Sequence, residues 1–143
     1  MAFISYVSED SERVDELERH LNRAGIAVWR DRGNLKPGQD WKLEIRKAIK
    51  NNELAFLACF SDHSARRAKT VQNEELALAA EEFRLRPPGT QWLFPVRFDP
   101  VEIPAFDLGA GRDLSTSLQW TDLFGHENVG NLIQLVSTIR DLL

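Results

Sequence analysis

The sequence predicts an α/β fold of flavodoxin-like topology, a doubly wound parallel five-stranded sheet with helices on both faces. Short apolar runs alternate with longer segments of helical periodicity along the chain, and this alternation is typical of βαβ units. One run, Leu54–Phe60, has no polar alternation, as expected of a central parallel strand that is covered on both faces. Crossovers between such strands are right-handed, and we therefore expect the strand order 2-1-3-4-5.

Length and composition fit one globular domain. The chain has 143 residues, of which 43% are hydrophobic and 28% charged. A chain of this length can bury a stable core without disulfides or structural metals. We expect residues 1–143 to form a single domain. The formal net charge of −4 argues against a nucleic-acid partner. The longest apolar run is too short to cross a membrane. Cys59 is the only cysteine, which suits a reducing, cytoplasmic compartment.

Five segments have the pattern of strands. They are Phe3–Val7, Ile26–Trp29, Leu54–Phe60, Trp92–Phe98 and Ser117–Asp122. The first begins so close to the N-terminus that we expect no signal peptide. Pro95 inside the fourth indicates an edge position or a bulge, because proline cannot donate to a ladder.

Four segments have the pattern of helices. The first carries Val14, Leu17, Leu21 and Ala24 and is followed by Gly25; the second follows Asp40 and carries Trp41, Ile45, Ala48 and Ile49. The third runs from about Thr70 to Leu85, and the last carries Val129, Leu132, Ile133, Val136, Ile139 and Leu143. Gly25 is placed to end the first helix and Asp40 to cap the second. We expect loops over Ser61–Lys69 and Asp99–Thr116.

Polar loops follow the strands of this predicted sheet. They cover Tyr6–Asp10, Arg30–Asp40, Ser61–Thr70 and the segment after Phe98. In open parallel sheets, ligands bind outside the carboxyl ends of the strands. We therefore expect the functional site among these loops.

Three segments resemble the Toll/interleukin receptor (TIR) domain family, in its bacterial NAD+-cleaving type. Phe3–Tyr6 and the acidic turn after it resemble the opening strand of that family. Gly25–Trp41, with its Asp31 and its Leu35-Lys36-Pro37-Gly38, resembles the second strand and the "BB loop", here residues 30–40. Phe60-Ser61, Ser64 and Val71–Glu74 resemble the third strand end and the helix that carries the family's glutamate.

The resemblance implies either an enzyme or a scaffold. As an enzyme, the chain would be an NAD+ nucleosidase that releases nicotinamide from NAD+ and gives ADP-ribose or a cyclic variant, as an effector in bacterial defence or cell-death signalling. By position, Glu74 would be its catalytic residue. As a scaffold, it would act only through TIR–TIR self-association. A receiver domain is a third reading, but the third strand ends Cys59-Phe60-Ser61, without the aspartate that a receiver needs.

The chemistry of NAD+ cleavage needs few groups. The leaving nicotinamide is a cationic pyridinium and departs without a proton, so one carboxylate can stabilise the oxocarbenium-like ribose. No metal is required, and His20, His63 and His126 lack ligand spacing. No Gly-x-Gly-x-x-Gly is present, so NAD+ would be a substrate and no cofactor is expected.

Six further residues are candidates for substrate contact. They are Tyr6, Ser8, Asp31, Leu35, Lys36 and Thr70. Ser8 and Asp31 have equally good readings as cap or turn residues. Thr70 stands four positions before Glu74, where many NAD+-cleaving relatives carry a stacking aromatic; here stacking would come from Tyr6 or a neighbouring subunit.

The acidic helix and the basic loop before it each have a plainer reading. Glu74 could simply belong to a solvated face, and Glu75 points about 100° away from it on a helix. Arg66, Arg67 and Lys69 could attract the pyrophosphate or belong to a solvated loop. Expected partners are NAD+, other TIR domains through residues 30–40, and a fused or separate sensor domain.

Overall fold

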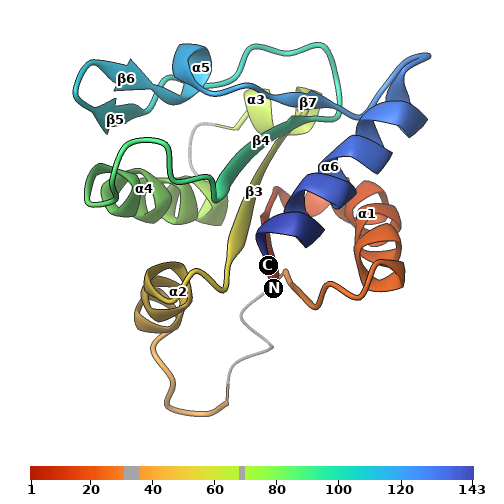
Figure 1. Cartoon of the computed structure of the whole chain (residues 1–143). Coiled ribbons are helices and arrows are strands. Elements are labelled where there is room, and N and C mark those ends of the chain that lie inside the picture. The colour runs from red at the N-terminus through yellow and green to blue at the C-terminus, as the bar shows by residue number, and fades with distance from the viewer. Residues whose placement is uncertain (31–35, 68–69) are drawn as a thin grey trace.

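Five parallel strands form the central sheet of this protein. The structure is a computed structural model that describes residues 1–30, 36–67 and 70–143. The strand order is β2-β1-β3-β4-β7, and Figure 1 labels its members β3, β4 and β7. The strands are β1 (Ala2–Ser5), β2 (Val28–Trp29), β3 (Ala55–Phe60), β4 (Leu93–Arg97) and β7 (Thr121–Asp122). The predicted flavodoxin-like fold class and its strand order are confirmed.

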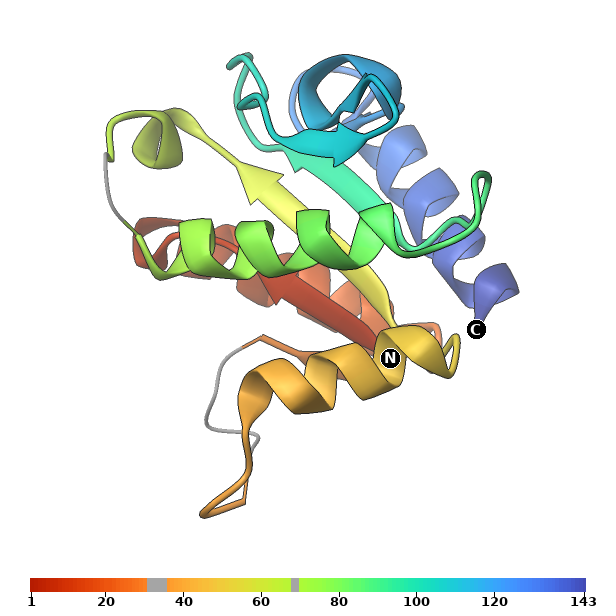
Figure 2. The same cartoon turned by 90° about the vertical axis from the view of Figure 1, so that its left-hand side faces the viewer.

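Helices cover both faces of the sheet, as Figures 1 and 2 show. On one face lie α1 (Ser11–Arg23) and α6 (Asn128–Leu142), and on the other lie α2 (Trp41–Lys50) and α4 (Val71–Arg84). Short helices η1 (Ser8–Asp10), α3 (Asp62–Ala65) and α5 (Leu114–Ser117) occupy the connections. A small antiparallel pair, β5 (Asp107–Gly109) and β6 (Arg112–Asp113), stands apart from the sheet.

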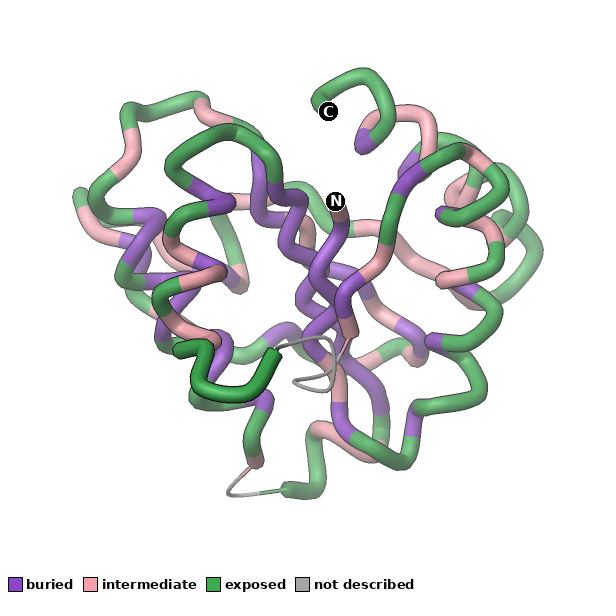
Figure 3. The backbone as a smooth tube through the Cα atoms, turned by 90° about the horizontal axis from the view of Figure 1, so that it is seen from below, coloured by how far each residue is buried: buried purple, intermediate pink, exposed green. Residues whose placement is uncertain are grey.

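The core consists of two apolar layers on either side of the sheet. Every residue of β3 is buried, which fits the unbroken apolar run in its sequence. Figure 3 shows the buried strands running through the middle of the molecule. On β1, Ala2 and Ile4 pack in the α1/α6 layer, whereas Phe3 packs in the α2/α4 layer. Side chains alternate along a strand, so Ser5 faces the same side as Phe3, toward α4.

Two predicted helix boundaries are present. Gly25 follows α1 with φ of 81°, a conformation that glycine adopts without steric cost. The Asp40 side chain accepts from the backbone N–H groups of Lys42 (3.1 Å) and Leu43 (3.4 Å) and so caps α2.

Several local predictions were wrong. The segment Ser61–Lys69 contains the helix α3, because Ser61 and Ser64 form a reciprocal capping box. Helix α5 occupies the start of the predicted fifth strand, so β7 is shorter and later than expected. Ser8 does not cap α1; it begins η1, and its hydroxyl donates to Glu9.

Pro95 and α6 also differ from expectation. Strand β4 lies inside the sheet, between β3 and β7. Its pairing with β7 begins at Val96, so Pro95 lies just before that ladder and takes no part in it. On α6 the core takes Leu135 and Ile139, whereas Val129 and Ile133 are exposed. None of the helices that the structure describes is both long enough and apolar enough to span a bilayer.

Candidate functional site

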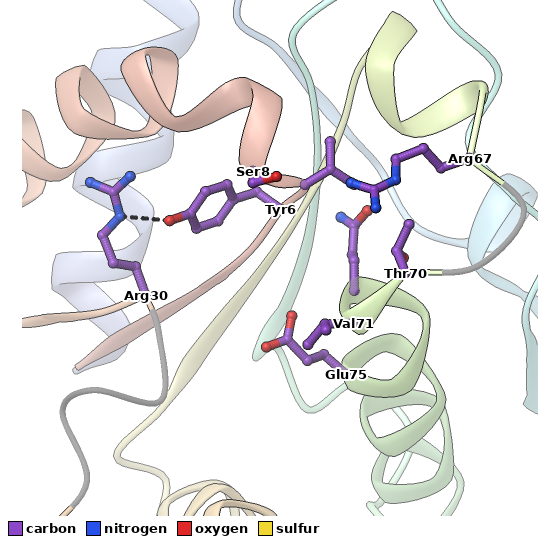
Figure 4. Close-up of a pocket in the computed structure, with 9 residues that line it drawn as sticks. Tyr6, Ser8, Arg30, Arg67, Thr70, Val71 and Glu75 are labelled. Atoms are coloured by element: carbon purple, nitrogen blue, oxygen red, sulfur yellow. Dashed lines mark hydrogen bonds between the residues drawn. The ribbon is translucent and has the colours of Figure 1, made fainter.

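A pocket of about 350 Å³ lies at the carboxyl edge of the sheet, where β1 ends and α4 begins (Figure 4). Its lining comes from the segments after β1, β2 and α3 and from the first turn of α4. The lining residues are Tyr6, Val7, Ser8, Arg30, Arg67, Thr70, Val71, Gln72 and Glu75. Hollows of about 630 and 600 Å³ lie elsewhere on the surface, but neither includes a predicted site residue. The pocket at β1 is therefore the candidate site.

Glu75 supplies the carboxylate of this pocket. It is 7% exposed, although it lines the cavity, and it lies in the first turns of α4. The Ser5 hydroxyl donates to Glu75 Oε1 across 2.9 Å. Buried carboxylates are costly unless they are hydrogen-bonded, so this contact offsets part of the cost of burying Glu75.

Glu74 lies outside the lining of this pocket. Its side chain is 47% exposed, and its Oε1 is 3.2 Å from Nζ of Lys42 on α2. The two helices are joined again farther along by Arg46, which contacts Glu81 and Glu82 of α4. The expected divergence of Glu74 and Glu75 is thus present, and the pocket receives Glu75.

Tyr6 and Arg30 form the wall nearest β2. Arg30 Nε donates to Tyr6 Oη at 3.0 Å, and the guanidinium carbon lies 5.1 Å from the ring centroid (Figure 4). Arg30 also contacts Asp15 and Glu18 of α1. Burial opposes the charge, but the hydrogen bonds that Arg30 donates to Asp15, Glu18 and Tyr6 outweigh it and raise the pKa of Arg30. Arg30 is a fixed cation that anchors Tyr6.

Thr70 and Gln72 set the position of α4. The Thr70 hydroxyl accepts from the Asn73 backbone N–H at 3.0 Å and caps the helix. Gln72 Nε2 donates to the carbonyls of Ser5 (3.1 Å) and Cys59 (2.6 Å), at the ends of β1 and β3. The first turn of α4 is thereby joined to the sheet edge.

The upper wall joins η1 to the segment around α3. Arg67 Nη1 lies 2.9 Å from Glu9 Oε1, and this exposed ion pair crosses from one segment to the other. The same two segments are joined by a buried contact, because the Ser61 hydroxyl donates to the carboxylate of Asp10. Arg67 is the side chain of this wall that could meet an anionic group of a ligand.

The predicted substrate contacts divide into three sets. Tyr6, Ser8 and Thr70 line the pocket together. Lys36 is exposed and is not among the lining residues; its backbone N–H donates to Gln39 Oε1 at 2.7 Å. Asp31 and Leu35 lie outside the described residues, and their roles stay predictions. Within the described ranges, no three His, Cys, Asp or Glu side chains gather in a way that could hold a metal ion.

The helical phase of α4 could have identified Glu75 from the sequence. Gln72, Glu75, Ala79 and Glu82 are all buried and recur at helical spacing. Glu74 is out of phase with that series. The family resemblance of Val71–Glu74 assigned the catalytic role to Glu74. The periodicity of the buried face of α4, in contrast, places Glu75 toward the sheet.

The comparison with family models supports the resemblance found in the sequence. A model described as TIR domain matches residues 2–136 and so includes the segments after Trp92, where motifs are sparse. A comparison with curated proteins gives no significant match.

Proposed function

The chain belongs to the TIR domain family, and from this premise we propose that it cleaves NAD+ at the nicotinamide–ribose bond, with Glu75 as the catalytic carboxylate. The observation that carries the proposal is a mostly buried carboxylate at the wall of an open pocket, at the sheet edge where such folds bind ligands. Glu75 takes the role that the sequence motif assigned to Glu74.

The proposed reaction is a hydrolysis. The C1′–N1 bond of NAD+ breaks, and its electron pair leaves with nicotinamide, which becomes neutral. Water then adds to C1′ of the oxocarbenium-like ribose and loses a proton, giving ADP-ribose. Glu75 stabilises the positive charge that develops on the ribose and is placed to take that proton. The cyclic product would form if a nucleophile of the adenine replaced the water.

Other pocket residues have roles that follow from their chemistry. Arg67 is suited to the pyrophosphate, for which it would leave Glu9. Tyr6 is the aromatic side chain among the lining residues and would stack on a ring of the substrate. A cavity of about 350 Å³ is small for a whole dinucleotide, so the adenosine part would extend beyond it.

A TIR scaffold is the second candidate function. The observation in its favour is the start of α4, where Thr70 and Val71 stand in place of a stacking aromatic. TIR domains commonly self-associate, and residues 30–40 would supply the contact. In either case we place the protein in the cytoplasm, where NAD+ and signalling partners are available, as an effector in bacterial defence.

Nicotinamide release tests the proposed function. The protein at high concentration is incubated with NAD+, and nicotinamide and ADP-ribose are quantified by chromatography. We expect release that Glu75→Gln abolishes. Absence of release at concentrations at which the protein self-associates would favour the scaffold.

A further inference from the structure

Ser5 contacts the proposed catalytic carboxylate from a position that is not among the pocket's lining residues. It is the last residue of β1 and is fully buried. Alternate residues of a strand face the same side of the sheet, so the Ser5 side chain points to the side of Phe3, toward α4. There its hydroxyl donates to Glu75 Oε1 at 2.9 Å, 70 residues away in sequence.

Gln72 holds the same two elements together at backbone level. It is 3% exposed, and its Nε2 bonds the Ser5 carbonyl as well as the Cys59 carbonyl. Gln72 and Glu75 are three positions apart and lie on one face of α4. The backbone of Ser5 thus fixes the helix while its side chain fixes the carboxylate.

We propose that Ser5 is a positioning residue for NAD+ cleavage: its hydroxyl aims the Glu75 carboxylate and keeps it charged, and Gln72 sets the depth at which α4 presents it. This inference rests on the proposed function. A hydrogen bond to the ionised form of a carboxylate favours that form. The bond from Ser5 also restricts the glutamate rotamers, which preorganises the group for the developing ribose cation.

The surroundings of Glu75 leave Ser5 as a separable contribution. Among the residues that the structure describes, the charged or titratable side chains that line the pocket with Glu75 are Arg30, Arg67 and Tyr6. From α2, Lys42 is paired with Glu74. A change at Ser5 alters none of these, so a shift in the titration of Glu75 would report the lost hydroxyl.

The test compares Ser5→Ala with Ser61→Ala. Ser61 is a matched control, because it is also a fully buried serine at the carboxyl end of a central strand, but its hydroxyl donates to Asp10. We expect Ser5→Ala to lower kcat by about tenfold or more, with a smaller change in KM. The midpoint of the acid limb of its pH–rate profile should shift upward by about one pH unit. Ser5→Thr, which keeps the hydroxyl, should restore both.

A second readout does not need turnover. Carbon-13 NMR of labelled glutamate side chains follows the titration of Glu75, assigned through Glu75→Gln. We expect its midpoint to rise in Ser5→Ala and to stay unchanged in Ser61→Ala. Equal titration curves in the two folded variants would overturn the inference, even if NAD+ is cleaved. A raised midpoint in a protein that shows no NAD+ cleavage would instead refute the proposed function and leave the contact established.

Discussion

Nζ of Lys42 lies 3.2 Å from Oε1 of Glu74, so an exposed ion pair links α2 to the first turn of α4. The neighbouring Glu75 is buried against Ser5 and faces the pocket. Exposed ion pairs contribute at most about 1 kcal/mol. The position of Glu74 therefore suggests a modest structural role, whereas Glu75 is placed for chemistry.

Exchanging the two glutamates for glutamine should separate these roles. We expect Glu75→Gln to abolish nicotinamide release and Glu74→Gln to retain most of it, with a free energy of unfolding lowered by less than about 1 kcal/mol. Chromatographic assay of NAD+ turnover, with circular dichroism as the folding control, measures both. Loss of turnover in folded Glu74→Gln with activity kept in Glu75→Gln would return the assignment to Glu74.

Replacing Tyr6 tests whether its ring or its hydroxyl matters. Tyr6→Phe keeps the ring but loses the 3.0 Å bond from Arg30, whereas Tyr6→Leu loses the ring as well. If the ring stacks on substrate, Tyr6→Leu should raise KM by about fivefold and Tyr6→Phe should change it little, since stacking contributes about 1 kcal/mol. Steady-state kinetics decide this. Equal KM values in the two variants would show that no stacking occurs there.

Removing the cap of α4 should disturb the site more than the fold. Thr70→Val keeps the shape of the side chain but removes the hydroxyl that accepts from Asn73, and Thr70→Ser restores it. We expect Thr70→Val to lower the free energy of unfolding by about 1 kcal/mol. Turnover should fall as well, because the frayed turn carries Gln72 and directly precedes Glu75. Urea unfolding and kcat measure the two effects; unchanged turnover would mean that the first turn is held without its cap.

The acid sensitivity of the fold should depend on Asp99. Arg13 donates to its carboxylate at 2.9 and 3.2 Å, and the Asp62 backbone N–H donates at 2.8 Å. The bond from Arg13 is the main reason that the pKa of Asp99 lies below its usual value. A lowered pKa in the folded state means stabilisation above about pH 4 that is lost as the pH falls further.

Asp99→Asn should accordingly cost about 1 kcal/mol at pH 7, a discounted value because Arg13 is partly exposed. The difference from the unaltered protein should shrink at pH 3. Urea unfolding at both pH values checks the sign. A cost that is the same at both would assign it to packing and not to charge.

Assembly through residues 30–40 should control activity. We expect specific activity to rise more than linearly with protein concentration, because head-to-tail TIR contacts build open assemblies. Gly38 has φ of 83°, which an alanine adopts only with strain, so Gly38→Ala should blunt this rise. Gly89→Ala is the matched control, since Gly89 has a similar φ of 87° in the turn after α4.

Light scattering and activity across a dilution series measure this together. Constant specific activity in a protein that stays monomeric throughout would exclude assembly control. An equal loss in Gly38→Ala and Gly89→Ala would trace the effect to backbone strain in general.

The sequence by itself determined the fold class, the strand order and the edge of the sheet at which the pocket lies. The alternation of apolar runs with helical segments is local information, and the handedness of crossovers restricts how such segments assemble. The capping of α2 by Asp40 and the end of α1 at Gly25 likewise depend only on the few residues around each position. Tyr6 and Ser8 were expected at this edge because they follow the first strand, and Thr70 because of the family resemblance.

The helical periodicity of α4 indicates which glutamate faces the sheet, but only the tertiary structure decided that this glutamate reaches a pocket and what holds it there. A shift of one residue on a helix rotates a side chain by about 100°, so the choice between Glu74 and Glu75 depends on how α4 packs on the sheet. Lys42 comes from α2 and Ser5 from β1, and no local pattern pairs them with their glutamates. The contacts that separate a surface ion pair from a buried carboxylate join segments far apart in sequence, and folding alone brings those segments together.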